Sequence, residues 1–85
     1  MEWSDEAKEI LTELLRYLPG NARDAVEEKT GVRAEVLTTE LGEDEVAMET
    51  AVRALVESTP ERMKARLREG LNYHGLDIDD FVQQA

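Results

Sequence analysis

The sequence predicts an all-α protein, a compact bundle of four to five short helices that form a single domain over residues 1–85. Three observations support this prediction. Several segments space their apolar residues by three and four positions, as one face of a helix requires. Proline and glycine separate most of these segments. A chain of 85 residues, 41% of them hydrophobic, suffices for one small domain and is too short for two.

The first helix is expected over residues 5–18. Ser4 is a favourable N-cap, and Asp5 and Glu6 suit the positive end of the helix dipole. Pro19 and the following glycine end the helix, because the residue before a proline avoids the helical region. The apolar residues at helical spacing are Ala7, Ile10, Leu11, Leu14, Leu15 and Leu18.

A short second helix is expected over residues 21–30, with Asn21 as N-cap and Gly31 just past its end. Residues 32–40 are ambiguous, since their valines and threonines fit a short strand as well as a connection. No partner strand is evident, and a lone strand is not stable. We therefore interpret residues 32–40 as a connection, with Thr38 or Thr39 capping the next helix.

The third helix is expected over residues 43–57. Three carboxylates, Glu43, Asp44 and Glu45, are placed in its first turn, where the helix dipole favours negative charge. Its apolar stripe consists of Ala47, Met48, Ala51, Val52 and Leu55.

The fourth helix is expected over residues 60–74. Ser58 or Thr59 caps it, Pro60 fits its first turn, and Glu61 closes a capping box on Ser58.

At the other end of this helix, Gly75 is placed to make a Schellman ending in which Leu71 contacts Leu76. Gly70 costs about 1 kcal/mol inside a helix and marks either a close helix contact or an earlier stop. A last short helix over residues 78–84 starts on an Asp77 cap.

Six leucines and valines of these stripes are expected in the core: Leu11, Leu14, Leu15, Val52, Leu55 and Leu67. Trp3, just ahead of the first helix, is interpreted as a plug at the edge of the core whose indole N–H finds a partner. The alternative is an exposed anchor for another protein, since tryptophan is enriched at binding hot spots.

The chain is acidic, with a net charge of −10. Such a surface repels nucleic acid and anionic membranes, so direct binding to either is not expected. No apolar run approaches the roughly 18 residues of a membrane span, no signal peptide is visible, and cysteine is absent. A cytoplasmic location is the corresponding expectation. The acidity fits a well-hydrated surface, a salt-adapted organism or an acidic protein that imitates nucleic acid.

No set of residues predicts catalysis, a cofactor or a metal ion. His74 is the one histidine, and a zinc site or a nucleophile–base pair needs partners that the sequence lacks. The carboxylates of Asp77, Asp79 and Asp80 lack the ligand number and the glycine of a calcium loop. Helix capping explains them better. Residues 61–69 form the one locally basic stretch, with too few aromatics for nucleic-acid binding.

The first half of the chain carries a recognisable set of residues: Trp3, Glu6-Ala7, Gly20, Ala22-Arg23, Ala25-Val26-Glu27 and Thr39-Glu40. With this set, residues 1–41 resemble the small helical domain at the C-terminus of the B subunit of light-independent protochlorophyllide reductase, also found as a free-standing protein. The segment 15–19 departs from the family pattern, and residues 42–85 are additional helices without a counterpart. The resemblance implies an accessory or interaction module and carries over no catalytic residue.

The leading functional hypothesis is a non-catalytic binding or accessory module whose partner is another protein. Two alternatives remain: an acidic regulator that binds a basic partner, and a detached accessory piece of a reductase-like tetrapyrrole system. The candidate interaction surface combines the tryptophan with an acidic cluster placed at the start of the third helix: Trp3, Glu40, Glu43, Asp44, Glu45 and Glu49.

Overall fold

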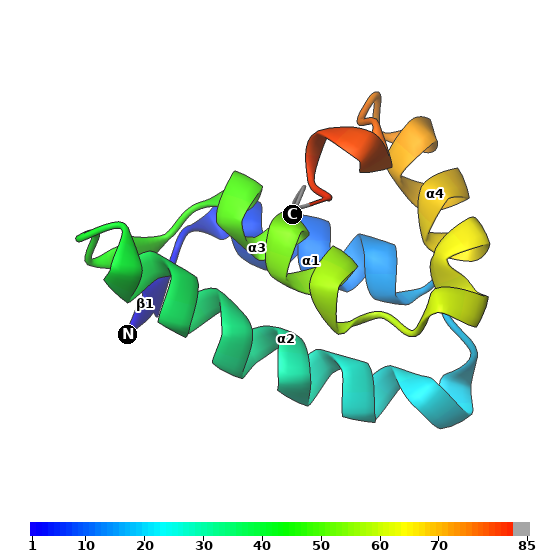
Figure 1. The fold of residues 1–85 in the computed structure, drawn as a ribbon, viewed down its shortest axis with the longest axis horizontal. Helices are drawn as coiled ribbons and strands as arrows, with labels where there is room; N and C mark the ends of the chain where they lie inside the picture. The colour runs from blue at the N-terminus through cyan, green and yellow to red at the C-terminus, as the bar shows by residue number, and fades with distance from the viewer. Residues whose placement is uncertain (83–85) are drawn as a thin grey trace.

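A computed structural model describes residues 1–82 and confirms the all-α prediction (Figure 1). α3 packs against both α1 and α2, while α4 packs against α1 at the end of the molecule opposite β1. The elements in order are β1 (Glu2–Trp3), α1 (Asp5–Leu15), α2 (Gly20–Glu40), β2 (Glu45–Val46), α3 (Met48–Ser58), the 3-10 turn η1 (Glu61–Met63), α4 (Lys64–Tyr73) and the 3-10 turn η2 (Ile78–Asp80).

α1 begins as predicted, because the Ser4 hydroxyl oxygen accepts a hydrogen bond from the Ala7 N–H at 3.0 Å. It ends at Leu15, three residues earlier than expected. Leu18 lies outside the helix yet is 2% exposed. Pro19 has no N–H to donate to the Leu15 carbonyl, so the regular helical hydrogen bonds stop there. The Arg23 guanidinium stabilises this end by donating to the carbonyls of Leu15 and Leu18 at 3.0 Å each.

The prediction of a short helix over residues 21–30 and a connection over residues 32–40 was wrong, because both segments belong to one helix, α2. Its N-cap is Pro19 rather than Asn21, and Gly31 lies in its interior. A buried position recurs every fourth residue, at Val26, Thr30, Ala34 and Thr38.

The threonines of α2 bond within the helix instead of capping α3. The hydroxyls of Thr30 and Thr38 donate to the carbonyls of Val26 and Ala34 at 2.7 and 2.8 Å. Thr39 donates in the same way to Glu35. Because their hydroxyls are paired within the helix, Thr30 and Thr38 can face the core of the protein without leaving a buried hydroxyl unsatisfied.

The start of the third helix was also misplaced, since α3 begins at Met48 rather than at residue 43. Glu45 and Val46 instead form β2, a short parallel pair with β1 in which Trp3 lies beside Val46. Val46 is completely buried, and its carbonyl accepts from the Ser4 N–H at 3.0 Å. This pairing holds the chain extended, so the carboxylates of residues 43–45 are outside the first turn of α3. Over residues 1–82 no sheet has more than these two strands.

The predicted cap of the fourth helix does not form. Pro60 occupies the N-cap position of η1 without a side-chain bond, and the Thr59 hydroxyl donates back to Leu55 at 2.6 Å. The C-terminal prediction is confirmed. Gly75 has φ +76°, and the Leu76 N–H donates to the Leu71 carbonyl at 2.8 Å, as in a Schellman ending.

The last predicted helix is shorter than expected within the described residues. Asp77 caps it as predicted, accepting from the Asp79 N–H at 2.9 Å. Only the 3-10 turn η2 follows, and residues 83–84 of the prediction lie outside the described part of the chain.

The predicted core is confirmed for five residues: Leu14, Leu15, Val52, Leu55 and Leu67 are all at most 5% exposed. Leu11 is only partly buried and packs on the edge of this cluster. A second cluster of small residues joins α1, α2, β2 and α3, and consists of Ala7, Ala34, Val46, Ala51 and Ala54 with Trp3 and Leu37 against it.

Added salt is expected to raise the melting temperature. The chain carries a net charge of −10, and three of the four ion pairs found over residues 1–82 include a side chain that is more than half exposed. Screening therefore relieves more repulsion than it removes attraction. Thermal melts from low salt to roughly 0.5 M NaCl test this. A double Glu27→Gln/Glu28→Gln variant should respond less, and a falling melting temperature would show that ion pairs dominate.

Candidate functional site

A cleft of about 530 Å³ lies where the C-terminal end of α2 meets the N-terminal start of α3. Both helices are held in place by the fully buried side chains between them, so the cleft walls are fixed by the core. Its lining combines carboxylates, apolar side chains, a threonine and an arginine: Leu37, Glu40, Leu41, Glu43, Ala47, Glu49, Thr50 and Arg53.

Three of the five acidic residues in the predicted surface converge on this cleft. Glu40 is the last residue of α2, and Glu49 lies in the first turn of α3. Glu43 follows Gly42, whose φ of +74° reverses the chain, and the Glu43 N–H donates to the Thr38 carbonyl at 3.1 Å. This left-handed residue is what folds Glu43 back over the end of α2.

The other two predicted acidic residues do not line the cleft. Asp44 is exposed in the loop between Gly42 and β2. Glu45 belongs to β2, where it pairs in register with Glu2. The predicted cluster is therefore divided, and Asp44 and Glu45 provide neighbouring carboxylates outside the cleft.

The apolar part of the cleft was not found from the sequence. Leu37 is half-buried, Ala47 is the N-cap of α3, and Leu41 leaves 62% of its surface exposed. The interpretation of residues 32–40 as a connection does not place Leu37 on a helix beside Glu40, where the structure has it. The spacing of Leu37 and Leu41 by four was the signal for it.

Arg53 is the cation of the cleft and was also missed. It follows Glu49 by four residues on α3, the spacing at which helical side chains are neighbours. Over residues 1–82 it forms no ion pair within 4.0 Å. Three carboxylates against one guanidinium leave the side chains of the cleft with a net charge of −2.

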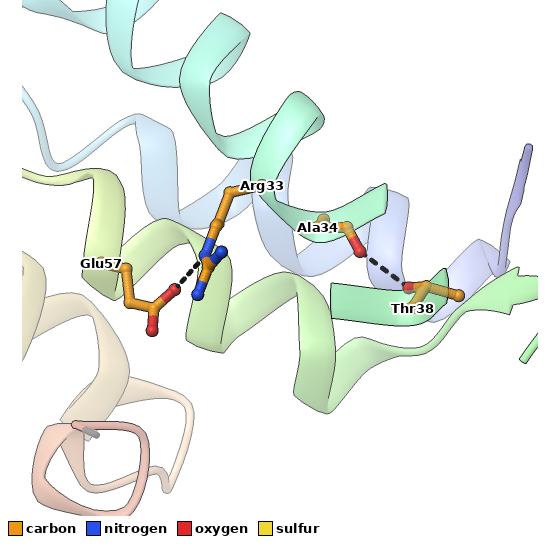
Figure 2. A network of polar contacts seen from close by, with 4 residues as sticks. All are labelled: Arg33, Ala34, Thr38 and Glu57. Atoms are coloured by element: carbon orange, nitrogen blue, oxygen red, sulfur yellow. Dashed lines mark hydrogen bonds and ion pairs between the residues drawn. The ribbon is translucent and has the colours of Figure 1, made fainter. Parts of the chain in front are cut away.

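An ion pair beside the cleft fixes α2 against α3. The Arg33 Nε–H donates to Glu57 Oε2 at 2.7 Å, and both side chains are partly shielded (Figure 2). The hydrogen bond to Glu57, then the negative charge of Glu57, and less strongly that of Glu40, raise the pKa of Arg33 above its usual value. Figure 2 also shows the Thr38–Ala34 bond one turn further along α2.

Trp3 lies in β1 and does not line the cleft. It packs against the second core cluster, and its Nε1–H donates to Glu35 Oε2 at 3.3 Å. A partly buried ring with a bonded indole N–H agrees with the interpretation of Trp3 as a plug at the edge of the core. Trp3 does not share the cleft with Glu40, Glu43 and Glu49, although its pairing with Val46 places it beside Glu45.

His74 is exposed at the C-terminal end of α4, where its ring meets that of Tyr73 edge-on at 5.4 Å. Across residues 1–82, no three histidine, aspartate or glutamate side chains lie close enough together to hold a metal ion.

Searches against protein-family models, curated proteins and solved structures give no match to this chain. None of the helices within residues 1–82 has the length and apolar character needed to cross a membrane.

Proposed function

We propose that this protein is a non-catalytic binding module whose cleft between α2 and α3 takes a basic segment of another protein. The observation that carries the proposal is the convergence of Glu40, Glu43 and Glu49 on one cleft with an apolar wall. Carboxylates that only hydrate the surface gain nothing from apolar side chains beside them, whereas a ligand that contacts both does.

The cleft chemistry fits a lysine or arginine side chain. Such a side chain has an aliphatic stem, which can lie on Leu37 and Leu41, and a cationic head, which the carboxylates can accept. The net charge of −10 also attracts a basic partner over a longer range and speeds its association. A regulator that presents its acidic face to a basic protein is the most specific form of this proposal.

The resemblance to the reductase domain supports a second proposal, a detached accessory piece of a reductase-like tetrapyrrole system. We place it behind the first, because residues 1–41 supply one wall of the cleft and residues 42–85 supply the other. The cleft is thus a feature that the resemblance does not cover. Genes for tetrapyrrole synthesis beside the gene for this chain would favour the second proposal.

Charge reversal within the cleft is expected to abolish binding of a basic peptide. The probe is a short peptide with two lysines between alanines, and binding is followed by NMR titration. Wild-type protein should bind with a dissociation constant of about 1 mM or tighter. A Glu43→Lys/Glu49→Lys variant should lose this binding because it inverts the charge of the cleft.

The matched control is Asp44→Lys/Glu45→Lys, which changes the net charge equally at neighbouring residues outside the cleft. This variant should keep most of the affinity and lose only long-range attraction. Equal losses in the two variants would show that the peptide responds to net charge, and the proposed binding cleft would be rejected.

A further inference from the structure

The side of α2 away from the core carries an apolar line that no element of residues 1–82 covers. Val32 is 65% exposed and Val36 is 42% exposed, although the inner side of the same helix already supplies core residues. A shallow groove of about 580 Å³ follows this line and is bounded by Ala25, Glu28, Lys29, Val32, Arg33 and Val36.

The spacing along this line is that of a helix–helix contact. Ala25, Lys29, Val32, Val36 and Thr39 are separated by four, three, four and three residues. This alternation keeps one stripe of a helix facing a second helix. We call these five residues the α2 seam. Glu28 and Glu35 flank the α2 seam on one edge, and Arg33 and Glu40 flank it on the other.

The charges of the α2 seam disfavour a second copy of this chain. In a parallel pair, Lys29 meets the Lys29 of the copy and Glu35 meets its Glu40, although Glu28 meets its Arg33. In an antiparallel pair, Glu28 meets the Glu35 of the copy. Each chain also carries a net charge of −10. Like charges at these positions select against self-pairing.

We propose that the α2 seam docks an amphipathic helix of a different protein. The charges of the α2 seam define this helix. It carries apolar residues opposite Val32 and Val36, carboxylates opposite Lys29 and Arg33, and lysine or arginine opposite Glu28 and Glu35. Charge complementarity at these flanking positions sets the choice of partner.

Arg33 is prepared for this role by its pair with Glu57. Within the described residues only its Nε–H is engaged, so its Nη groups remain for a second carboxylate (Figure 2). The bond to Glu57 also holds the guanidinium in one orientation, which reduces the entropy lost when a partner binds. This inference goes beyond the proposed function, because none of the five residues of the α2 seam lines the cleft, although Glu40 flanks the seam and also lines the cleft.

Two designed helical peptides test the inference. Both place leucine opposite the valines of the α2 seam and glutamate opposite Lys29. In the second peptide, glutamate and lysine are exchanged at the positions that flank the leucines. As a result, the charges of one peptide complement those of α2 when the two helices run parallel, and the charges of the other do so when they run antiparallel. At least one should bind in an NMR titration, with shifts centred on the backbone amides of residues 25–36.

Substitutions at exposed positions with matched controls locate the contact. Val32→Glu should weaken the binding at least about tenfold, whereas Val82→Glu, at an exposed valine distant in sequence, should leave it unchanged. Glu28→Lys should weaken it by about two- to fivefold. Glu27→Lys makes the same charge change outside the groove and should have a smaller effect.

Three results would overturn the inference. The first is that neither peptide binds, and the second is that Val32→Glu leaves the affinity unchanged. The third is that sedimentation of the protein alone shows a dimer that Val32→Glu dissociates, because the occupant would then be a second copy of this chain. A Glu43→Lys/Glu49→Lys protein should still bind the helical peptide. Loss of peptide binding in the cleft and loss of helix binding at the α2 seam can therefore be told apart.

Discussion

Replacing Leu55 by alanine is expected to lower the free energy of unfolding by about 2–5 kcal/mol. Leu55 is completely buried in α3, the helix that packs against both α1 and α2. A domain of this size has a total stability of about 4–13 kcal/mol, so the variant loses a large share of it. The melting temperature should fall by about 10 °C or more. Leu14, equally buried in α1, should respond in the same way.

Leu41→Ala is the matched control for Leu55→Ala. It removes the same atoms from a side chain that is 62% exposed, so its melting temperature should change by only a few degrees. Urea unfolding followed by circular dichroism measures both variants. Equal stability of Leu55→Ala and Leu41→Ala would contradict the packing of α3 described above.

Adding a single methyl group at Gly70 is expected to destabilise the protein. A Cβ atom there would lie 2.7 Å from Cδ2 of the Tyr17 ring, well inside van der Waals contact. Displacing the ring costs about 1–3 kcal/mol, which should outweigh the roughly 1 kcal/mol that alanine gains over glycine in a helix. We expect Gly70→Ala to lower the stability by about 1 kcal/mol.

Gly31→Ala is the matched control for Gly70→Ala and is expected to stabilise the protein. Gly31 is also inside a helix, and nothing lies within 4 Å of the position of its missing Cβ. The variant should therefore be more stable by about 1 kcal/mol. In a Tyr17→Ala background, Gly70→Ala should likewise become stabilising. If Gly70→Ala stabilises the protein with Tyr17 present, the close contact of α4 with Tyr17 does not constrain residue 70.

The sequence predicts the parts of this fold whose signals are local. The Ser4 cap and the Schellman ending at Gly75 depend on a few neighbouring residues, and both are confirmed. The leucine stripe of α1 predicts its buried face for the same reason. Gly70 marks a close contact rather than an earlier stop, because α4 continues to Tyr73 and the ring of Tyr17 lies against Gly70.

The errors arise where long-range packing decides the local structure. Gly31 and the threonines of residues 30–39 disfavour a helix, but the buried face of α2 and the bonds of its threonines to preceding carbonyls override that preference. The extended segment Glu45–Val46 depends on pairing with Glu2 and Trp3, more than 40 residues away. The pairing of Glu45–Val46 has no signal within its own segment, and the spacing of Leu37 and Leu41 by four is a weak local signal for the second half of α2.

Long-range packing also explains why the sequence predicts only part of the candidate site. The carboxylates were recognisable as a cluster in sequence, yet only Glu40, Glu43 and Glu49 share the cleft. Which of the five converge depends on the reversal at Gly42 and on β2. Leu37 and Leu41 form the apolar wall because α2 continues to Glu40, and Arg53 faces the cleft because it follows Glu49 by four residues on α3. Placing the apolar wall therefore requires the full length of α2.

The most direct test of the central claim is a map of backbone amide shifts when the dilysine peptide is added to isotope-labelled wild-type protein. The proposed cleft predicts that the largest shifts cluster at its lining, from Leu37 to Glu43 and from Ala47 to Arg53, and that they saturate together. Shifts spread evenly over all exposed carboxylates, or confined to Asp44 and Glu45, would contradict a binding cleft between α2 and α3.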